Sequence, residues 1–292
     1  MTALPVTNVD KVLWPDAGFT KGAMIDYYRQ VAPVLLPHIK DRPLTMRRFP
    51  DGIEEWSWYQ YECRDAPDFV ATVDIPYRGG APRRFCVVND LASLIWVANL
   101  ATIELHPYLA RSDALDEPSF VVFDLDPGAP ADVVDCARVA LRLREELNAL
   151  GLASFAKSSG SVGLHVYVPL NRPHGYDRTK PFARALARRL AAELPNAIVD
   201  RNAKQLRLGR VLVDWLQNAP ARSTIAPYSL RAMPWPTVST PLTWDEVERV
   251  ATEARAELVT FVADDLPARL ERHGDLFRGV LDLEQELPRS LD

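Results

Sequence analysis

One short apolar stretch that ends in two carboxylates constrains this chain more than any other feature. Residues 120–123 read Phe-Val-Val-Phe, a β-branched and aromatic run typical of a buried strand. Asp124, Leu125 and Asp126 follow, and Pro-Gly at 127–128 predicts the end of the strand. Because side chains alternate across a strand, Asp124 and Asp126 should project from one face, about 6–7 Å apart, while Leu125 points into the core.

Two carboxylates held this close repel each other, and a divalent cation would relieve the repulsion. All-oxygen ligation favours Mg²⁺ or Mn²⁺ over zinc. The alternative is a strand end with two solvated acids, since Asp often closes a strand. These two residues alone do not decide between the two interpretations.

A third acid favours the metal site. Asp214 lies within a second apolar strand at 210–216, where an unpaired carboxylate would be costly to bury. We hypothesise that this strand lies beside the first one. The three acids would then form a carboxylate cage of the kind used in two-metal phosphoryl chemistry.

Composition sets the broad class of the protein. A length of 292 residues predicts one large domain or two closely joined ones. The net charge of −5 means that any nucleic-acid contact must come from local basic patches. The N-terminus has no basic region followed by an apolar run, so we expect no signal peptide, no membrane span and a cytoplasmic location. The three cysteines, Cys63, Cys86 and Cys136, form no CxxC pair, which argues against a zinc site and against a disulfide framework.

Strands interrupted by helices, together with hairpins, predict an α+β fold or an α/β mixture built on mixed sheets. No G-x-G-x-x-G or Walker loop is present, which excludes a doubly wound nucleotide-binding fold. The elements expected from periodicity are helices at 20–36, 91–102, 131–150, 179–194, 243–251 and 264–274, and strands within 42–50, 68–89 and 164–168. We expect a single domain over residues 1–292, with DNA-contacting elements in 1–110, a catalytic core in 111–250 and closing helices in 251–292.

Basic and aromatic residues gather in the first third of the chain. Arg47 is followed by the run Trp56-Ser57-Trp58-Tyr59-Gln60-Tyr61, which suits base stacking beside phosphate contacts or, equally, packing under a loop. A hairpin tip near 77–84 carries Arg83 and Arg84. Lys21 stands in a first helical turn, where the helix dipole disfavours a cation, so it is either a solvated lysine or a residue with another task.

Two further stretches carry weaker signals. The loop Ser158-Ser159-Gly160-Ser161-Val162-Gly163 has the small residues that let backbone N–H groups approach an anion, and His165 follows it. Arg184, Arg188 and Arg189 on the helix at 179–194 indicate a solvated face. Together with the three acids, these features fit metal-assisted phosphoryl or nucleotidyl transfer best.

Four motifs occur in a fixed order: Phe-Asp-Leu-Asp-Pro-Gly at 123–128, Ser-Gly-Ser-x-Gly-Leu-His at 159–165, Val-Asp-Trp-x-Gln-Asn at 213–218 and Ala-Pro-Tyr-Ser-Leu-Arg at 226–231. In these motifs the chain resembles the polymerase domain of bacterial DNA ligase D, the end-joining branch of the archaeo-eukaryotic primase superfamily. The resemblance runs from Asp10-Lys11-Val12-Leu13-Trp14-Pro15 to about Trp244. It implies a primase-polymerase-like core of mixed and antiparallel sheets flanked by helices.

The resemblance also implies site residues. The metal-binding and catalytic acids are Asp124, Asp126 and Asp214, holding two divalent cations, Mn²⁺ or Mg²⁺. The nucleotide-binding residues are Arg47, His106, Ser159, Ser161, His165, Arg207, Gln217 and Arg231. The DNA-binding residues are Lys11 and Lys21, which match lysines that grip a downstream 5′-phosphate, and Trp58 and Tyr59, which match a template-side aromatic pair. To these the basic hairpin tip adds Arg83 and Arg84.

Three positions depart from the family pattern. Val162 stands in place of a lysine, Met233 in place of a second arginine, and Arg47 where the family often has lysine. The first two changes remove positive charge near the expected triphosphate. They predict weaker nucleotide affinity or a changed nucleotide or metal preference.

The resemblance therefore implies a DNA-dependent nucleotidyltransferase that adds dNTPs or rNTPs to primer 3′ ends at short gaps or breaks in non-homologous end joining. The implied partners are DNA with a gap or a recessed or overhanging end and a 5′-phosphate, the incoming nucleotide, Ku and a separate DNA ligase. Two alternatives stay open, a primer-independent primase and a catalytically weakened module that binds 5′-phosphorylated ends. A two-metal nuclease would use the same acids but would leave Ser159, Arg207 and Arg231 without a role.

Overall fold

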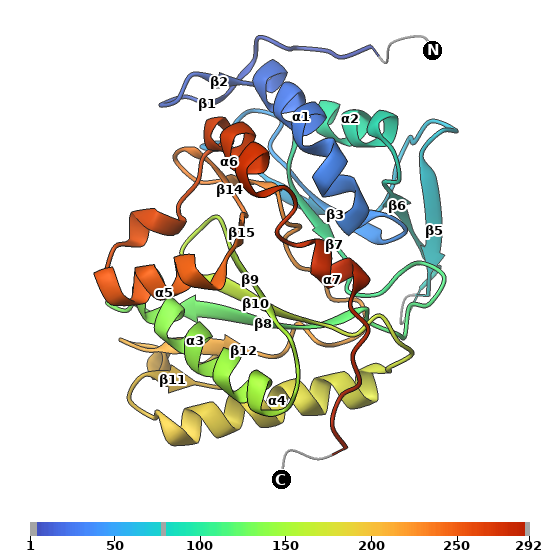
Figure 1. The fold of residues 1–292 in the computed structure, drawn as a ribbon. Helices are drawn as coiled ribbons and strands as arrows, with labels where there is room; N and C mark the ends of the chain where they lie inside the picture. The colour runs from blue at the N-terminus through green and yellow to red at the C-terminus, as the bar shows by residue number, and fades with distance from the viewer. Residues whose placement is uncertain (1–4, 77–79, 290–292) are drawn as a thin grey trace. The chain divides into compact units, whose positions relative to one another are not determined.

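The computed structural model describes residues 5–76 and 80–289, so part of the basic hairpin tip, residues 77–79, lies outside the described residues. The chain divides into two compact units (Figure 1). The first comprises residues 1–113, 223–239 and 262–274, and the second comprises residues 114–222, 240–261 and 275–292. Both contain helices and largely antiparallel sheets, which confirms the predicted α+β class.

The first unit is built on a sheet in the order β4-β3-β6-β5, with β7 paired to β3. Thr20 caps α1 by accepting a hydrogen bond from the Ala23 N–H, and the buried face of α1 packs beside α2. The elements of this unit are β1 (Val12–Trp14), β2 (Phe19–Thr20), α1 (Lys21–Ile39), β3 (Pro43–Arg48), β4 (Trp58–Gln60), β5 (Ala71–Ile75), β6 (Arg83–Val87), α2 (Leu91–Asn99), β7 (Thr102–Pro107), β13 (Leu230–Ala232), β14 (Pro236–Val238), η3 (Ala263–Asp265) and α6 (Leu266–His273).

The helix predicted at 91–102 is shorter than expected. It ends at Asn99, because Ala101 adopts a left-handed conformation with φ of 58°. Residues Thr102–Pro107 then form β7, which pairs antiparallel with β3. The sequence analysis missed this strand, which carries Glu104 and His106.

The expectation that the cysteines form no disulfide is wrong. Cys63 and Cys86 are joined in the first unit, with their Cα atoms 4.8 Å apart. The Cys63 N–H donates to the Arg84 carbonyl over 2.7 Å, which lays the segment after β4 alongside β6. Spacing alone could not reveal this pair, because its closeness depends on how that segment runs beside β6. Cys136 is free and buried.

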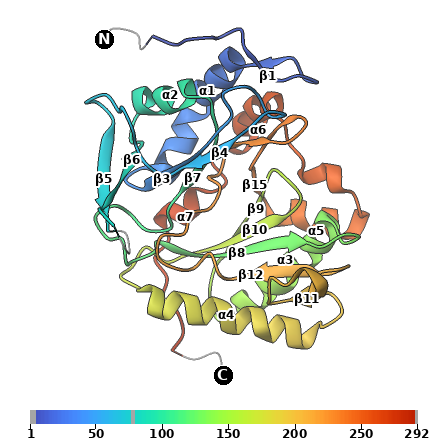
Figure 2. The same ribbon diagram turned by 180° about the vertical axis from the view of Figure 1, so that it is seen from behind.

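The second unit is a six-stranded sheet in the order β11-β12-β8-β10-β9-β15 (Figure 2). All neighbouring strands are antiparallel except β11 and β12. The elements are β8 (Phe120–Pro127), α3 (Val133–Ala149), β9 (Phe155–Ser158), β10 (Leu164–Pro169), α4 (Tyr176–Glu193), β11 (Ile198–Val199), η1 (Lys204–Leu206), β12 (Val211–Asp214), β15 (Pro241–Leu242), α5 (Trp244–Glu253), η2 (Ala256–Val259) and α7 (Arg278–Asp282).

Strand alternation decides which face of this sheet is apolar. Val121, Phe123 and Leu125 on β8 are fully buried in the core that the sheet forms with α3 and α4. Asp124 and Asp126 therefore face the opposite side. None of the helices described here is both long and apolar enough to span a bilayer.

Candidate active site

The hypothesis that the two aspartate-bearing strands are neighbours is confirmed. β12 pairs antiparallel with β8, and Asp214 stands directly opposite Asp124. Val213 lies in the helix-covered core, so Asp214 projects from the same face of the sheet as the two acids of β8. The three carboxylates thus belong to two adjacent strands and one face.

These carboxylates influence one another. Burial raises the pKa of Asp214, a hydrogen bond from the Leu216 N–H at 2.8 Å opposes the rise, and the charges of Asp124 and Asp126 add to it. The pKa of Asp214 therefore lies above its ordinary value. A bound cation would lower it again, because the cation would offset the like charges that face this carboxylate.

Two basic side chains contact the acids of β8. His165, opposite Asp124 in the β10–β8 pairing, has its Nε2 3.2 Å from an Asp124 oxygen. Arg207 donates to Asp126 over 2.5 Å and to Asn202 over 3.1 Å. The sequence-predicted residues His165 and Arg207 are therefore brought to the carboxylates themselves.

We tested whether these acids fit a divalent cation. Carboxylate oxygens are the ligands that hard cations prefer. Burial, and to a smaller extent the charges of Asp124 and Asp126, raise the pKa of Asp214, so a bound cation would favour its ionised form. Within the described ranges, no three His, Cys, Asp or Glu side chains are already arranged to hold a metal ion. The donor chemistry therefore fits a hard cation, with Arg207 as the competing cation at Asp126.

The Ser/Gly loop is fixed between β9 and β10. Ser159 is buried, and its hydroxyl accepts hydrogen bonds from the N–H groups of Ser161 and Gly163, both over 3.1 Å. A Cβ on Gly163 would lie 2.1 Å from the Leu125 carbonyl oxygen, so only glycine allows the loop to approach β8 this closely. Val162, in the same loop, is 53% exposed. Gln217 lies outside this loop, in the turn that follows β12.

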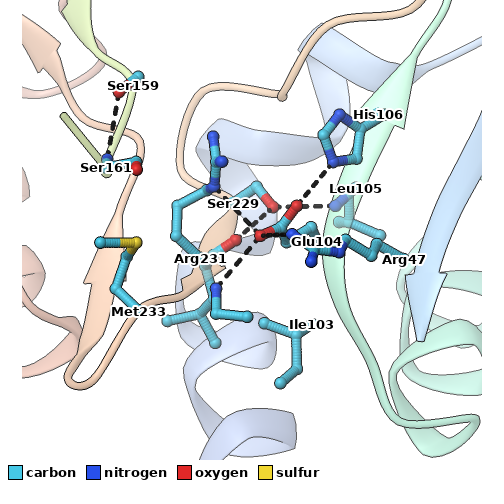
Figure 3. A network of polar contacts seen from close by, with 12 residues as sticks. Arg47, Ile103, Glu104, Leu105, His106, Ser159, Ser161, Ser229, Arg231 and Met233 are labelled. Atoms are coloured by element: carbon cyan, nitrogen blue, oxygen red, sulfur yellow. Dashed lines mark hydrogen bonds and ion pairs between the residues drawn. The ribbon is translucent and has the colours of Figure 1, made fainter. Parts of the chain in front are cut away.

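A second polar cluster, in the first unit, surrounds Glu104 on β7 (Figure 3). This side chain is 1% exposed. Its Oε1 accepts from Arg47 over 3.3 Å, from the Arg231 Nε over 3.2 Å and from the Ala232 N–H over 3.2 Å. Its Oε2 lies 2.9 Å from the His106 Nε2. Three sequence-predicted residues, Arg47, His106 and Arg231, thus meet at one acid that sequence reasoning missed.

Electrostatics keep Glu104 charged although it is buried. Burial opposes ionisation, but the hydrogen bond with His106 and the charges of Arg231, His106 and Arg47 outweigh it and lower the pKa of Glu104 to about 2. Burial also lowers the pKa of His106, against the opposing effect of Glu104. With His106 neutral, two arginines and one carboxylate leave the cluster with one positive charge.

The predicted DNA-binding residues all lie in the first unit. Lys21 is buried, its Nζ donates to the Thr7 carbonyl over 2.7 Å, and burial lowers its pKa. Lys11 pairs with Asp51 over 2.5 Å. The carbonyl of Thr7 thus offsets the unfavourable position of Lys21 at the start of α1.

The aromatic residues line a groove of about 280 Å³ that includes Trp58, Tyr59 and Arg83. Trp58 stacks on Trp56 at 4.5 Å between ring centroids, while Tyr59 meets the edge of His106 at 5.5 Å. Arg84 instead pairs with Asp74 through two hydrogen bonds of 2.8 and 2.9 Å.

Together, the mixed α+β fold, the three acids on paired strands and the adjoining Ser/Gly loop fit the primase-polymerase class. A family model described as "LigD, primase-polymerase domain" matches residues 20–277. The chain belongs to the LigD primase-polymerase domain family, a family of DNA-directed nucleotidyltransferases. Membership implies the use of divalent metal ions.

Individual proteins of this family are similar to the chain over most of its length. The multifunctional non-homologous end joining protein LigD of Mycolicibacterium smegmatis is 37% identical over 274 residues, covering 93% of this chain and 35% of that protein. The bifunctional LigD of Bacillus subtilis is 30% identical over 290 residues, covering 98% of this chain and 46% of that protein. This chain thus spans less than half the length of these relatives. The solved polymerase domain of Mycobacterium tuberculosis Ligase D, in complex with DNA, matches with a TM-score of 0.89 and 34% identity, covering 99% of this chain and all of that one.

Replacing Glu104 by Gln tests the buried charge. Glu104→Gln removes the buried counter-charge of Arg47 and Arg231, so we expect the free energy of unfolding to fall by about 3 kcal/mol at pH 7. The matched control is Glu62→Gln, a more exposed acid paired with Arg64, which should cost under about 1 kcal/mol. Urea denaturation of both variants measures the difference.

The pH dependence of the stability deficit tests whether Glu104 is ionised. The pKa of Glu104 is about 2 in the folded protein, below its ordinary value, so its stabilisation is complete above about pH 5 and is lost as the pH falls towards 2. The deficit of Glu104→Gln relative to wild type should therefore shrink between pH 7 and about pH 3.5. A deficit that grows or stays constant over this range would contradict an ionised Glu104.

Proposed function

We propose that this chain extends primer 3′ ends in a DNA-dependent manner, using dNTPs or rNTPs, at short gaps or at DNA breaks during end joining. The observation that carries the proposal is the placement of Asp124 opposite Asp214, beside Asp126, on one face of the β8–β12 pair. Membership of a polymerase-domain family supports the reaction class, and the M. tuberculosis relative solved in complex with DNA supports the substrate.

The cofactor is Mn²⁺ or Mg²⁺, held as two cations by Asp124, Asp126 and Asp214. When bound, the cations activate the attacking 3′-hydroxyl and stabilise charge on the departing pyrophosphate. His165 orients Asp124 by its contact of 3.2 Å. Arg207, which donates to Asp126 over 2.5 Å, would contact the nucleotide phosphates beside this acid.

Each unit carries candidate nucleotide-binding residues of its own. The set in the second unit consists of Ser159, Ser161, His165, Arg207 and Gln217. The set in the first unit is Arg47, His106 and Arg231, organised by Glu104. Its residual positive charge suits a triphosphate, because one buried acid neutralises only one of two arginines.

Binding of DNA is assigned to residues of the first unit. Lys11 and Lys21 would hold a downstream 5′-phosphate, and their nearness is reflected in the charge of Lys11, which contributes to the lowered pKa of Lys21. Trp58 and Tyr59 would stack on template bases, with Arg83 and Arg84 contacting phosphates. This assignment keeps DNA contacts within residues 1–110, the catalytic acids within 111–250 and a closing role for 251–292. Ku, a separate DNA ligase and a cytoplasmic location complete the proposal.

Loss of one acid should abolish synthesis. In Asp124→Asn, primer extension on a gapped duplex with Mn²⁺ should fall at least about 100-fold, beyond what losing a partner outside the metal site costs. DNA binding measured by anisotropy should stay within about twofold. Mn²⁺ should raise the Tm of wild type but not of the variant, because binding to the folded state stabilises it.

The matched control is Asp116→Asn, an exposed acid in the loop before β8, which should extend primers like wild type. Unprimed synthesis on a single-stranded template would instead favour the primase reading. Extension that persists in Asp124→Asn would remove Asp124 from the metal site and overturn the proposed mechanism.

The exposed Val162 provides a test of the nucleotide site. Val162→Lys restores a cation where the family has lysine, and its side chain has room because Val162 is 53% exposed. The KM for the nucleotide should fall about 3–10-fold with kcat little changed, as one added charge contact of about 1 kcal/mol implies. Leu283→Lys, at another exposed position of the same unit, is the control for added charge alone. Equal KM values for both variants would rule out a charge deficit at position 162.

A further inference from the structure

A second groove of the catalytic unit lies beside α4, on the face of the sheet away from the three carboxylates. It has a volume of about 800 Å³, and we call it the α4 groove. Four cations of α4 and one indole line it: Lys180, Arg184, Arg188, Arg189 and Trp215. The sequence analysis interpreted the arginines as a solvated face, and the three are indeed exposed. The proposed polymerase chemistry gives none of them a role.

Strand alternation separates this groove from the catalytic acids. Trp215 directly follows Asp214, so the two side chains leave the end of β12 on opposite sides. Trp215 packs against the helix-covered core, and its indole N–H donates to the Asp200 carbonyl over 3.0 Å. The indole is therefore held in one orientation beside α4.

Two of the cations share this indole. The Lys180 Nζ lies 5.9 Å from the ring centroid, and the Arg184 guanidinium carbon lies 5.2 Å from it. An arginine plane over a fixed tryptophan is a platform on which an unpaired base can stack. Within the described part of the chain, neither cation lies in an ion pair with a carboxylate.

The other two cations are partly neutralised. Arg188 lies 3.6 Å from Asp200, and Arg189 lies 3.3 Å from Glu146. Even so, α4 carries five basic residues against two acidic ones, a surplus of three positive charges in a chain whose net charge is −5. Lys180, Arg184 and Arg188 recur every four residues, about 6 Å apart along one helix face.

We propose that the α4 groove binds a single nucleic-acid strand, with its phosphates on this row of cations and an unpaired base on the Arg184–Trp215 platform. A row of cations beside an aromatic ring is the arrangement used by proteins that bind single strands without sequence preference. An acidic peptide would match the charge but would leave the stacking surface unused. The inference goes beyond the proposed polymerase reaction, because this binding requires none of the three carboxylates.

The test reverses the charge of the two residues that contact the indole, Lys180 and Arg184. Lys180→Glu combined with Arg184→Glu in the full chain should weaken binding of a labelled 15-nucleotide single strand about 10-fold or more. The slope of log K against log salt should fall by about 1.4, because each lost phosphate contact on a single strand contributes about 0.7. Arg249→Glu with Arg255→Glu on the same unit makes the same change in net charge and should leave the slope unchanged.

Three further variants keep the test decisive. Asp124→Asn should retain the wild-type slope, so a failure of the proposed polymerase function would show separately from a failure of this inference. Trp215→Phe should bind more tightly than Trp215→Ala, because a ring is retained for stacking. A salt slope unchanged by the double reversal would overturn the inference. Displacement of the strand by oligoglutamate as efficiently as by unlabelled DNA of equal charge would also overturn it, in favour of an acidic protein partner.

Discussion

The antiparallel pairing of β8 with β12 is the constraint on which the second unit depends. It places Asp214 opposite Asp124, and the two-residue period of both strands then fixes what each face carries. Val121, Phe123 and Leu125 are buried against the helices, so the alternate positions can present acids to the other side. Because burial of each large apolar side chain contributes about 1.5–3 kcal/mol, the core offsets the repulsion between the carboxylates that it holds in place.

Glu104 and Asp214 are two acids of this protein with opposite electrostatic surroundings. Glu104 is surrounded by Arg47, Arg231 and His106, which lower its pKa to about 2, so its charge is already compensated. Asp214 faces two further carboxylates and has a raised pKa. An acid whose neighbours are cations orients those cations. An acid whose neighbours are acids is the one that a divalent cation would stabilise.

Much of this arrangement could be predicted from local sequence patterns, because strands and helix starts depend mainly on residues that are neighbours in the chain. The apolar run before Asp124, the Thr20 cap and the strand around Asp214 were all readable in this way. The role of Glu104 was not, since its partners come from β3 and β13 as well as β7, and Arg231 is 127 positions away. The Cys63–Cys86 disulfide could not be predicted for a similar reason, because it depends on the segment after β4 running alongside β6 and not on spacing.

Arg207 neutralises one of the acids at the end of β8. A Cβ on Gly128 would lie 2.0 Å from the Arg207 carbonyl oxygen, and the Gly128 N–H donates to the Arg210 carbonyl over 2.8 Å. The backbone around Arg207 is therefore packed against the end of β8, while its side chain is held by Asp126 and Asn202. The guanidinium is thus a built-in counter-ion of Asp126, and a divalent cation bound to this carboxylate would have to displace it. In the proposed metal site, Arg207 and the cation would therefore compete for the same carboxylate.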